Sequence, residues 1–410
     1  MKPAVARIGA RLQMPAAALL VLAGTVATAF FCKQTLPQSF DGQRPNDFPN
    51  YYVAGLRLWE GRPIYAPHAE EVRTRLGFAD YPTNIADSPF AVVALSPLAR
   101  LPYRPAFFCL YVFSLLAGPG VAFASTRALK APAWMALGAA GLTLFSNQYR
   151  FLLMFNHMES LLLCLLVAGW LCLRSGRGRL GAALWGAAAA LKLFPGLLLV
   201  LLLAQSRWRA ALWGGATAAA LLLLCSMVIG WSSAVEFATH VIPYSHVWYG
   251  HGYNVSLMSI GTRAAGPAAG WSMALLALAA VGGVVGRSRG DPDRLFVAGT
   301  AGMLLASPLS WLGYGILLLP ALAIVAKQLV PGDHAGRRLL LAALVLTQFW
   351  PFLSGSETPP LARFLFFTVP PAAGYALVVL LAARHWKNAS RGDETDSSPG
   401  TISAQPVRPP

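Results

Sequence analysis

The stretch Met14–Phe31, MPAAALLVLAGTVATAFF, is an apolar run without a charged residue, and it decides the class of fold. Its length approaches the roughly 20 residues that an α-helix needs to cross a bilayer. Lys2, Arg7 and Arg11 precede it, as in a secretory signal, but the many later apolar runs favour a retained signal anchor. The run is therefore predicted to be a membrane-spanning helix.

The composition supports a membrane protein along the whole chain. Of the 410 residues, 56% are hydrophobic and only 12% are charged, whereas a soluble domain carries about a quarter charged residues. The alternating pattern of an outer-membrane barrel is absent. We predict an all-α polytopic membrane protein with about 10–13 transmembrane helices. The predicted spans lie near residues 14–32, 105–126, 132–153, 157–173, 180–194, 210–230, 269–286, 294–306, 310–327, 339–354 and 363–384, with a further short apolar piece at 196–205.

Basic residues give the predicted orientation. With the N-terminus in the cytoplasm, the Lys and Arg clusters between apolar runs fall in cytoplasmic turns, as the positive-inside rule requires. The net charge of +16 is thus explained by topology, and no nucleic-acid partner is expected. The scheme requires that the run 88–99, which contains Pro89 and Pro97, is re-entrant or interfacial. The high alanine content is typical of a GC-rich bacterial genome, so we expect a bacterial inner-membrane protein with both termini in the cytoplasm.

One membrane domain is expected over residues 14–385, between a cytoplasmic N-terminus, 1–13, and a disordered cytoplasmic tail, 386–410. Two outer loops are large, 33–104 and 231–263. The first loop is predicted to contain two short helices lying on the membrane surface, and the second is rich in His and aromatic residues. The two predicted surface helices are Leu56–Trp59 and Ala69–Leu76.

Most acidic residues fall on the outer side in this scheme, although Asp and Glu do little to set topology. This bias indicates chemistry at the outer face. The residues concerned are Asp41, Asp47, Glu60, Glu70, Glu71, Asp80, Asp87, Glu159, Glu236 and Glu357.

The first outer loop holds the polar, aromatic stretch Asn46–Gly55, NDFPNYYVAG. Asp47 is a candidate general base, positioned to take a proton from an acceptor hydroxyl. Asp is also a favoured residue before a helix, so Asp47 as the N-cap of a surface helix is an equal alternative. Tyr51 and Tyr52 are candidate substrate contacts beside it.

Lys192 ends an apolar helix just before the helix-breaking Pro195. It is either a lysine that extends its ammonium to the membrane surface or a contact for a phosphate. An ammonium this close to the apolar region needs an anionic partner.

The stretch Asn156-His157-Met158-Glu159 opens a span on the outer side. Ionisable residues there are candidates for function, which includes His157 and Glu159. The alternative is a helix cap, with Asn156 at the N-cap and Glu159 three residues later.

The second outer loop adds His251, Asn254 and Arg263 as candidate binding residues. Arg suits a phosphate because its planar guanidinium donates two parallel hydrogen bonds. For the histidine the alternative is an aromatic ring at the membrane surface.

The sequence has no phosphate-cradling glycine loop, zinc motif or serine elbow. The five cysteines show no metal-ligand spacing, so neither a metal nor a cofactor is expected. The energy for a reaction must then arrive in an activated substrate, and the charge distribution favours a lipid phosphate at the outer leaflet.

In order and spacing, four segments together resemble glycosyltransferase family 87, over about residues 14 to 385. The segments are Asp47 with Tyr51-Tyr52-Val53-Ala54, Gly61 and Tyr65; Tyr81-Pro82-Thr83 with Leu95-Ser96-Pro97-Leu98; Ala190-Leu191-Lys192-Leu193-Phe194-Pro195 with Arg207-Trp208-Arg209; and Asn254-Val255-Ser256-Leu257 with Arg263 and Ser307-Pro308-Leu309-Ser310-Trp311.

The resemblance implies a GT-C fold and inverting transfer of a hexose or pentose from a polyprenyl-phosphate sugar to a lipid, glycan or protein acceptor outside the cytoplasm. It implies that Asp47 activates the acceptor hydroxyl and that Lys192 and Arg263 hold the lipid phosphate. The chain departs from the family pattern twice. It has Asn156-His157 where many members have Gly-Gln, and Tyr81-Pro82-Thr83 where members often have Tyr-Pro-Pro.

Two other functions compete with this interpretation. A lipid or glycan transporter or flippase is expected to have ionisable residues deep within its spans and matched half-repeats. An O-antigen-type polymerase is expected to carry its main outer loop later in the chain. The sequence favours the transferase because its candidate residues lie at the outer rim and its large loop follows the first span.

Overall fold

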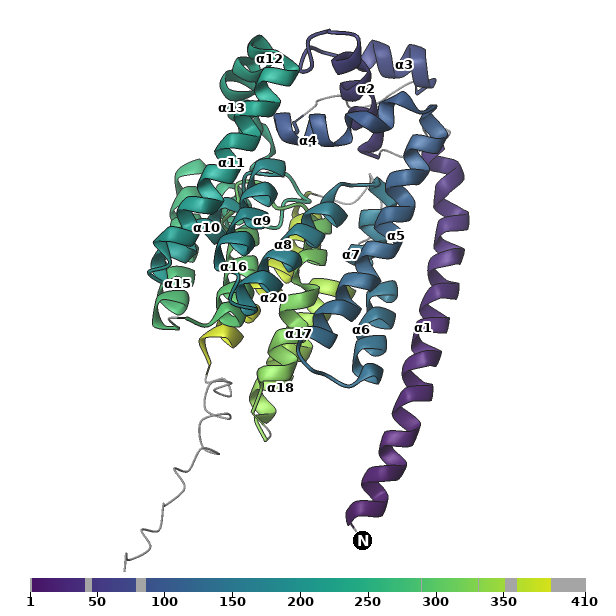
Figure 1. Cartoon of the computed structure of the whole chain (residues 1–410), viewed down its shortest axis with the longest axis vertical. Coiled ribbons are helices and arrows are strands. Elements are labelled where there is room, and N and C mark those ends of the chain that lie inside the picture. Colours follow the sequence, from purple (N-terminus) through teal and green to yellow (C-terminus); the bar gives the residue numbers. More distant parts are fainter. Residues whose placement is uncertain are drawn as a thin grey trace, which may run out of the picture.

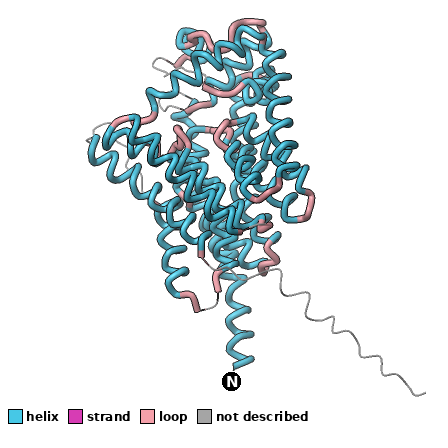
Figure 2. Tube along the Cα trace, turned by 90° about the vertical axis from the view of Figure 1, so that its left-hand side faces the viewer, coloured by secondary structure: helices cyan, strands magenta, loops and turns pink. Residues whose placement is uncertain are grey.

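The computed structural model of the chain describes residues 2–40, 46–78, 86–288, 290–330, 332–350 and 360–384. Over these residues the secondary structure is helical, apart from a single isolated β-bridge between Asn254 and Trp311. Figure 2 shows the helices joined by mostly short loops. The prediction of an all-α polytopic membrane protein is confirmed. The Tyr81-Pro82-Thr83 segment and the predicted tail, 386–410, lie outside the described residues.

Five of the described helices are long and apolar enough to cross a membrane by themselves. The predicted total of about 10–13 transmembrane helices includes shorter ones and stays a prediction. The five candidate spans are Gln13–Phe40, Tyr103–Ala128, Trp208–Ile229, Pro267–Arg287 and Phe364–Ala383.

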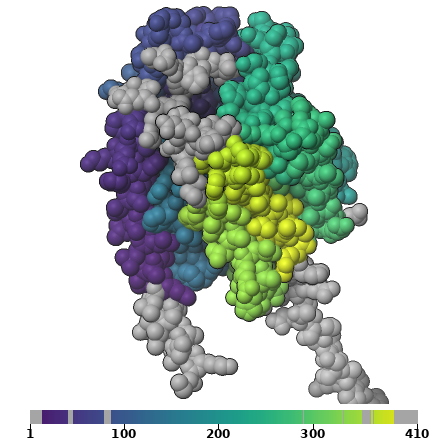
Figure 3. Space-filling view, turned by 180° about the vertical axis from the view of Figure 1, so that it is seen from behind, coloured from purple at the N-terminus to yellow at the C-terminus, as the bar shows by residue number. Residues whose placement is uncertain are grey.

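Helix α1, Lys2–Phe40, stands along one flank of the molecule (Figures 1 and 3) and packs against α6, Ala133–Phe145. The first outer loop was expected to begin at Lys33, but the helix continues to Phe40. The reason is packing, because the Phe40 ring lies 4.9 Å from the ring of Phe107 on the neighbouring α5, Tyr103–Ala128. The outer loop is therefore shorter than predicted at its start.

One end of the bundle carries α2, Phe48–Trp59; α3, Ala69–Leu76; and α4, Pro89–Leu95. We call it the loop end (Figure 1). The predicted helix Ala69–Leu76 is confirmed, and the predicted helix at Leu56–Trp59 is the last part of α2. In Figure 1, α4 lies crosswise to the long helices, and the 3-10 helix η1, Ser96–Arg100, continues from it.

Arg57 holds the loop end together. Its guanidinium is 4% exposed and pairs with Glu71 of α3 at 2.5 Å. It also donates hydrogen bonds to the backbone oxygens of Pro63, Ala66 and Pro67. One buried cation thus ties α2, α3 and the turn between them into a unit, which fixes the direction in which α2 presents its side chains.

Helices α8, Glu159–Arg174, and α9, Gly178–Leu191, pack against each other as a hairpin. They have 16 and 14 residues, so at 1.5 Å per residue they are about 24 and 21 Å long, shorter than the roughly 30 Å apolar core of a bilayer. Glu159 and Lys192, at the ends of the two helices away from the turn that joins them, therefore lie at nearly the same level along the bundle. Neither helix is long enough to cross the apolar core of a bilayer from that turn.

The segment 196–205 is also shorter than a crossing. It forms α10, Gly196–Ala204, whose 9 residues give about 13 Å. It begins four residues after Lys192, which follows the end of α9. The predicted span 132–153 is likewise divided, at Ser146, into α6 and α7, Asn147–Phe155. There the Ser146 hydroxyl caps α7 by accepting a hydrogen bond from the Tyr149 amide.

The core lies around α8, α9 and α16, Pro292–Ala306, where Phe296 stacks against Trp170 and Trp185 at ring distances of 5.4 and 6.4 Å. The remaining elements are α11, Trp208–Ile229; α12, Trp231–Glu236; η2, Phe237–Val241; α13, Ile242–Tyr244; η3, Ser245–Trp248; α14, Leu257–Ala265; α15, Pro267–Arg287; η4, Leu312–Leu318; α17, Leu319–Gln328; α18, His334–Leu344; η5, Val345–Phe349; α19, Pro360–Arg363; η6, Phe364–Thr368; and α20, Val369–Ala383.

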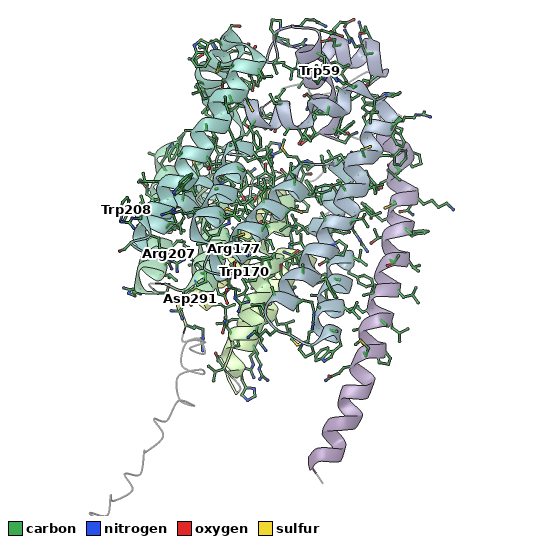
Figure 4. All side chains as sticks on the ribbon, viewed as in Figure 1. Trp59, Trp170, Arg177, Arg207, Trp208 and Asp291 are labelled. Carbon is green, nitrogen blue, oxygen red and sulfur yellow. The ribbon has the colours of Figure 1, made fainter. Side chains whose placement is uncertain are left out.

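Hydrogen bonds between neighbouring turns fix the end of the bundle opposite to the loop end. Arg207 donates to the backbone oxygen of Gly290 at 2.7 Å, and the Asp291 carboxylate caps α16. Figure 4 shows Arg207 and Asp291 far from Trp59, which lies at the loop end. The turn between α8 and α9 carries Arg177.

Helices α9 and α11 approach each other closely where Gly186 faces Gly214. A Cβ atom on Gly186 meets the backbone oxygen of Gly214, which cannot give way as a side chain can. We expect Gly186→Leu to separate the helices and to lower the free energy of unfolding by about 3 kcal/mol or more. The measurement is the thermal unfolding midpoint of the purified protein in detergent. Gly120→Leu on α5, where a Cβ meets no atom within 4 Å, is the matched control. Equal midpoints for the two variants contradict the prediction.

Candidate functional site

Asp47 occupies the N-cap position of α2, but its side chain makes no capping hydrogen bond. Its φ and ψ of −87° and −13° differ from the extended conformation of a capping residue. Its amide instead donates a hydrogen bond to the Phe155 backbone oxygen at 2.9 Å, which fixes it against the end of α7. The side chain is 42% exposed. Asp47 is therefore not a helix cap in this fold, and its carboxylate is available for another role.

The Asp47 carboxylate contacts the His157 side chain. Asn156 ends α7 in the left-handed conformation, with φ of 49°, and donates to the Phe107 backbone oxygen at 3.1 Å. Asn adopts this conformation more readily than most residues, and the resulting turn brings His157 Nε2 to 2.9 Å from Asp47 Oδ2. His157 Nδ1 lies 2.9 Å from Glu159 Oε2. Both are close charge contacts without hydrogen-bond alignment, and they place the ring between two carboxylates.

Glu159 connects His157 to Lys192. The expected cap with Asn156 at the N-cap is wrong, because Met158 holds that position and Glu159 is the first residue of α8. The Glu159 side chain is 1% exposed, and its Oε1 accepts a hydrogen bond from Lys192 Nζ at 2.6 Å. The N-terminus of α8 adds a favourable field for this buried carboxylate.

Lys192 is therefore the paired lysine that its position near the apolar region required. Besides Glu159, its ammonium donates to the Tyr314 hydroxyl at 2.9 Å and lies 4.9 Å from that ring's centroid. We call Asp47, His157, Glu159, Lys192 and Tyr314 the Asp47 network. It joins four separate segments of the chain, and it brings together four of the residues that the sequence singled out.

Asp87 lies beside this network, although the sequence analysis did not select it as a candidate. The Ser88 hydroxyl donates to the backbone oxygens of Ala190 and Leu191, at 2.5 and 3.0 Å, which places Asp87 next to the end of α9. Burial raises the pKa of Asp87 to about 6; Lys192 opposes the rise and the carboxylate of Asp47 adds to it. The sequence offers one signal for Asp87. Ser88-Pro89 is a helix-start pattern, which predicts that Asp87 lies in the loop just before α4.

Tyr51 and Tyr52 have different roles. Tyr51 is 6% exposed, and burial together with the carboxylates of Asp87 and Asp47 raises the pKa of its hydroxyl. Tyr52 instead donates to the backbone oxygen of Leu101 at 2.8 Å, in a contact between α2 and the turn before α5. The Tyr52 hydroxyl thus holds the fold, and substrate contact by either tyrosine stays a prediction.

The second outer loop forms another group of residues. Asn254 Nδ2 donates to the Pro308 backbone oxygen at 2.7 Å, and its Oδ1 accepts from the Ser310 amide at 3.0 Å. Both ends of this amide are thus used to join the second loop to the segment before η4. The Asn254 side chain thus has a structural role, and its contact with substrate stays a prediction.

His251 and Arg263 remain candidates in that group. The His251 ring packs against the ring of Trp311, with centroids 5.4 Å apart. The Arg263 guanidinium lies 4.9 Å from the centroid of the Phe364 ring. Trp311 directly precedes η4, which carries Tyr314 of the Asp47 network. The two groups therefore adjoin through one short segment, although Arg263 does not belong to the Asp47 network.

The described residues contain no group of three or more His, Cys, Asp or Glu side chains arranged to hold a metal ion. The Asp47 carboxylate is partly exposed and is held in place by buried charged side chains. A carboxylate held in this way can take up and release a proton.

Comparison with known proteins adds a family. The family model described as glycosyltransferase family 87 matches residues 87–312, more than half of the chain. The match covers Asp87, His157, Glu159 and Lys192, and it begins after Asp47. No curated protein and no solved structure matches the chain.

Proposed function

Because the chain belongs to glycosyltransferase family 87, we propose that it transfers a hexose or pentose from a polyprenyl-phosphate sugar to a lipid, glycan or protein acceptor. Membership makes it a membrane glycosyltransferase. The proposed transfer takes place on the extracytoplasmic side of the membrane, at the loop end, and inverts the anomeric carbon. The observation that carries the proposal is the anchored, partly exposed carboxylate of Asp47, which is suited to activate an acceptor hydroxyl.

In the proposed reaction the acceptor oxygen attacks the anomeric carbon on the face opposite to the phosphate. The acceptor proton passes to Asp47, and Oδ1 is the oxygen that takes it because Oδ2 faces His157. The bond between the anomeric carbon and the phosphate oxygen breaks, and its electron pair leaves with the polyprenyl phosphate. Attack and departure on opposite faces give inversion.

His157 positions the base in this proposal. Its two ring nitrogens face carboxylates of Asp47 and Glu159, each at 2.9 Å, and both nitrogens can donate only when the ring is protonated. Lys192 balances Glu159 on the far side, so the ring is held between charges that are themselves fixed.

The leaving phosphate needs cationic donors near the network. Lys192 is paired with Glu159 and Tyr314, which leaves one of its three N–H groups for a ligand. The proposal places the phosphate between this N–H group and the adjoining second-loop group of Arg263 and His251, where the planar guanidinium of Arg263 suits a phosphate. Charge developing on the phosphate oxygen is stabilised there without any rearrangement of the network.

The depth of the site fits a lipid-borne donor. Glu159 and Lys192 end helices of 16 and 14 residues, about 24 and 21 Å above the turn that joins them. With the basic turn at the inner edge of the roughly 30 Å apolar core of a bilayer, this level is toward the outer edge of that core. A phosphate carried by a polyprenol can approach the site from the membrane, while the acceptor enters from the loop end.

The experiment is incubation of the purified protein with a panel of polyprenyl-phosphate hexoses and pentoses and a mixture of acceptors. Released polyprenyl phosphate is measured, and the anomeric configuration of the product is determined by NMR. The proposal expects release with at least one donor and an inverted product. A retained configuration overturns the mechanism. Absence of release with every donor, while a related transferase works in the same assay, overturns the donor class.

A further inference from the structure

Two polar side chains beside Asp47 have no partner among the described residues. The Asp87 carboxylate is partly exposed and makes neither a hydrogen bond nor an ion pair with any of them. The Tyr51 ring is 6% exposed, and its hydroxyl likewise has no hydrogen-bond partner there. Neither group is among the fully buried side-chain atoms that lack a partner, so a ligand can reach both of them and supply hydrogen bonds to each.

Hydrogen bonds hold the backbone around Asp87, but the Asp87 carboxylate has no hydrogen-bond partner among the described residues. The Tyr65 hydroxyl donates to the Asp87 backbone oxygen at 2.9 Å, and Ser88 is tied to the end of α9. Helix α4 packs against α2, the helix that carries Tyr51. The backbone that carries the two side chains is therefore fixed from two directions, as in a preformed binding site.

We propose that Asp87 and Tyr51 form a subsite that binds the hydroxyl groups of a sugar ring beside Asp47. The inference rests on the proposed function and adds the residues that select a polyhydroxylated ligand. A carboxylate accepts hydrogen bonds from two neighbouring hydroxyls, and a phenol both donates and accepts one.

The charges around the pair favour this ligand over others. Asp47, Asp87 and Glu159 together oppose a phosphate, and Lys192 and His157 oppose a free cation. A neutral group rich in hydroxyls meets neither obstacle. The sugar belongs either to the polyprenyl-phosphate donor or to a glycan acceptor, and both have the same hydroxyl chemistry.

The test compares binding with and without the sugar. Polyprenyl-phosphate mannose, bare polyprenyl phosphate and a lipid-free mannose disaccharide are titrated into the full-length protein in nanodiscs, and the dissociation constants are measured. We expect the wild type to bind the mannose-bearing lipid more tightly than the bare lipid. The gain from the sugar is the ratio of the dissociation constant of the bare lipid to that of the mannose-bearing lipid. Asp87→Asn should lower this ratio about tenfold or more, and Tyr51→Phe about fivefold, because each removes hydrogen bonds to hydroxyls.

The controls are Glu70→Gln, an exposed carboxylate on α3, and Tyr103→Phe, a buried hydroxyl on α5 that has no partner among the described residues. Neither should change the gain. If Asp87→Asn and Tyr51→Phe weaken only the disaccharide, the subsite holds the acceptor sugar. If both variants keep the full gain and also bind the disaccharide as the wild type does, or if the wild type does not prefer the mannose-bearing lipid to the bare lipid and does not bind the disaccharide, the inference is wrong.

The pH dependence gives a second test of the same subsite. The groups that face Asp87 are Lys192, Asp47, Glu159, His157 and Tyr51. As the pH falls through about 6, Asp87 takes up a proton and loses acceptor capacity, so the gain from the sugar should decrease. The Asp87→Asn variant should not show this decrease at that pH. A decrease of equal size in the variant means that another group is responsible.

These binding measurements do not depend on turnover. A protein that distinguishes the mannose-bearing lipid through Asp87 but releases no polyprenyl phosphate contradicts the proposed function and supports the subsite. A protein that turns the donor over with unchanged binding in both variants supports the proposed function and contradicts the subsite.

Discussion

Asp47→Asn is expected to lower sugar transfer by about 10²–10⁴-fold, the range that a positioned general base contributes. The amide has nearly the shape of the carboxylate but cannot take a proton from the acceptor hydroxyl. Stability should change little, because the Asp47 side chain makes no capping hydrogen bond in the wild type. The measurement is the initial rate of polyprenyl phosphate release, together with the thermal unfolding midpoint of the variant.

Asp291→Asn is the matched control for this change. Asp291 precedes α16 at the opposite end of the bundle (Figure 4), where its carboxylate accepts hydrogen bonds from the amides of Asp293 and Arg294. Asn caps a helix about as well as Asp, so this variant should keep both stability and turnover. Near-normal turnover of Asp47→Asn, with the control also active, means that another group accepts the proton. Asp87 is then the first candidate, because its carboxylate adjoins the network.

The class of fold could be predicted from the sequence because apolar runs and basic turns are local patterns. The departures have causes that hydropathy and charge patterns do not record. Phe40 extends α1 through its contact with Phe107, far along the chain. Ser146 divides an apolar stretch whose hydropathy continues across the break. Helix α10 is apolar throughout but only 9 residues long, because Pro195 and the turn after Ala204 set its ends.

The site could be predicted only one residue at a time. The sequence identifies Asp47 by its chemistry in the first outer loop, and His157, Glu159 and Lys192 by their chemistry at the ends of spans. For Asp47 and His157, nothing nearby in the sequence reveals the partner. A usable signal existed for one pair. Glu159 and Lys192 stand at the free ends of two helices of nearly equal length joined by a short turn, which predicts that they meet. Asp87 carries no such signal, because the contact of Ser88 with α9 joins distant parts of the chain.

Removal of either partner of the Glu159–Lys192 pair is expected to destabilise the protein strongly. The two side chains are 1% and 15% exposed, so Glu159→Leu leaves an ammonium, and Lys192→Met a carboxylate, in a site with little water. Breaking a buried pair in this way costs about 3–5 kcal/mol. Lys192→Met should be the milder change, because His157 still faces Glu159. The measurement is the unfolding midpoint of each purified variant in detergent, alongside its expression in the membrane.

The double variant separates the role of the pair in folding from its role in the reaction. Replacing a whole buried ion pair by apolar side chains of similar size is often neutral for stability, so Glu159→Leu with Lys192→Met should unfold at a higher temperature than either single variant. Turnover should not return with stability, because His157 has lost the contact that Glu159 makes with its Nδ1 and no longer holds Asp47 in place. A double variant that is both stable and active contradicts the assignment of Glu159 as a positioning residue. A double variant less stable than both single variants contradicts the view that the two charges chiefly neutralise each other.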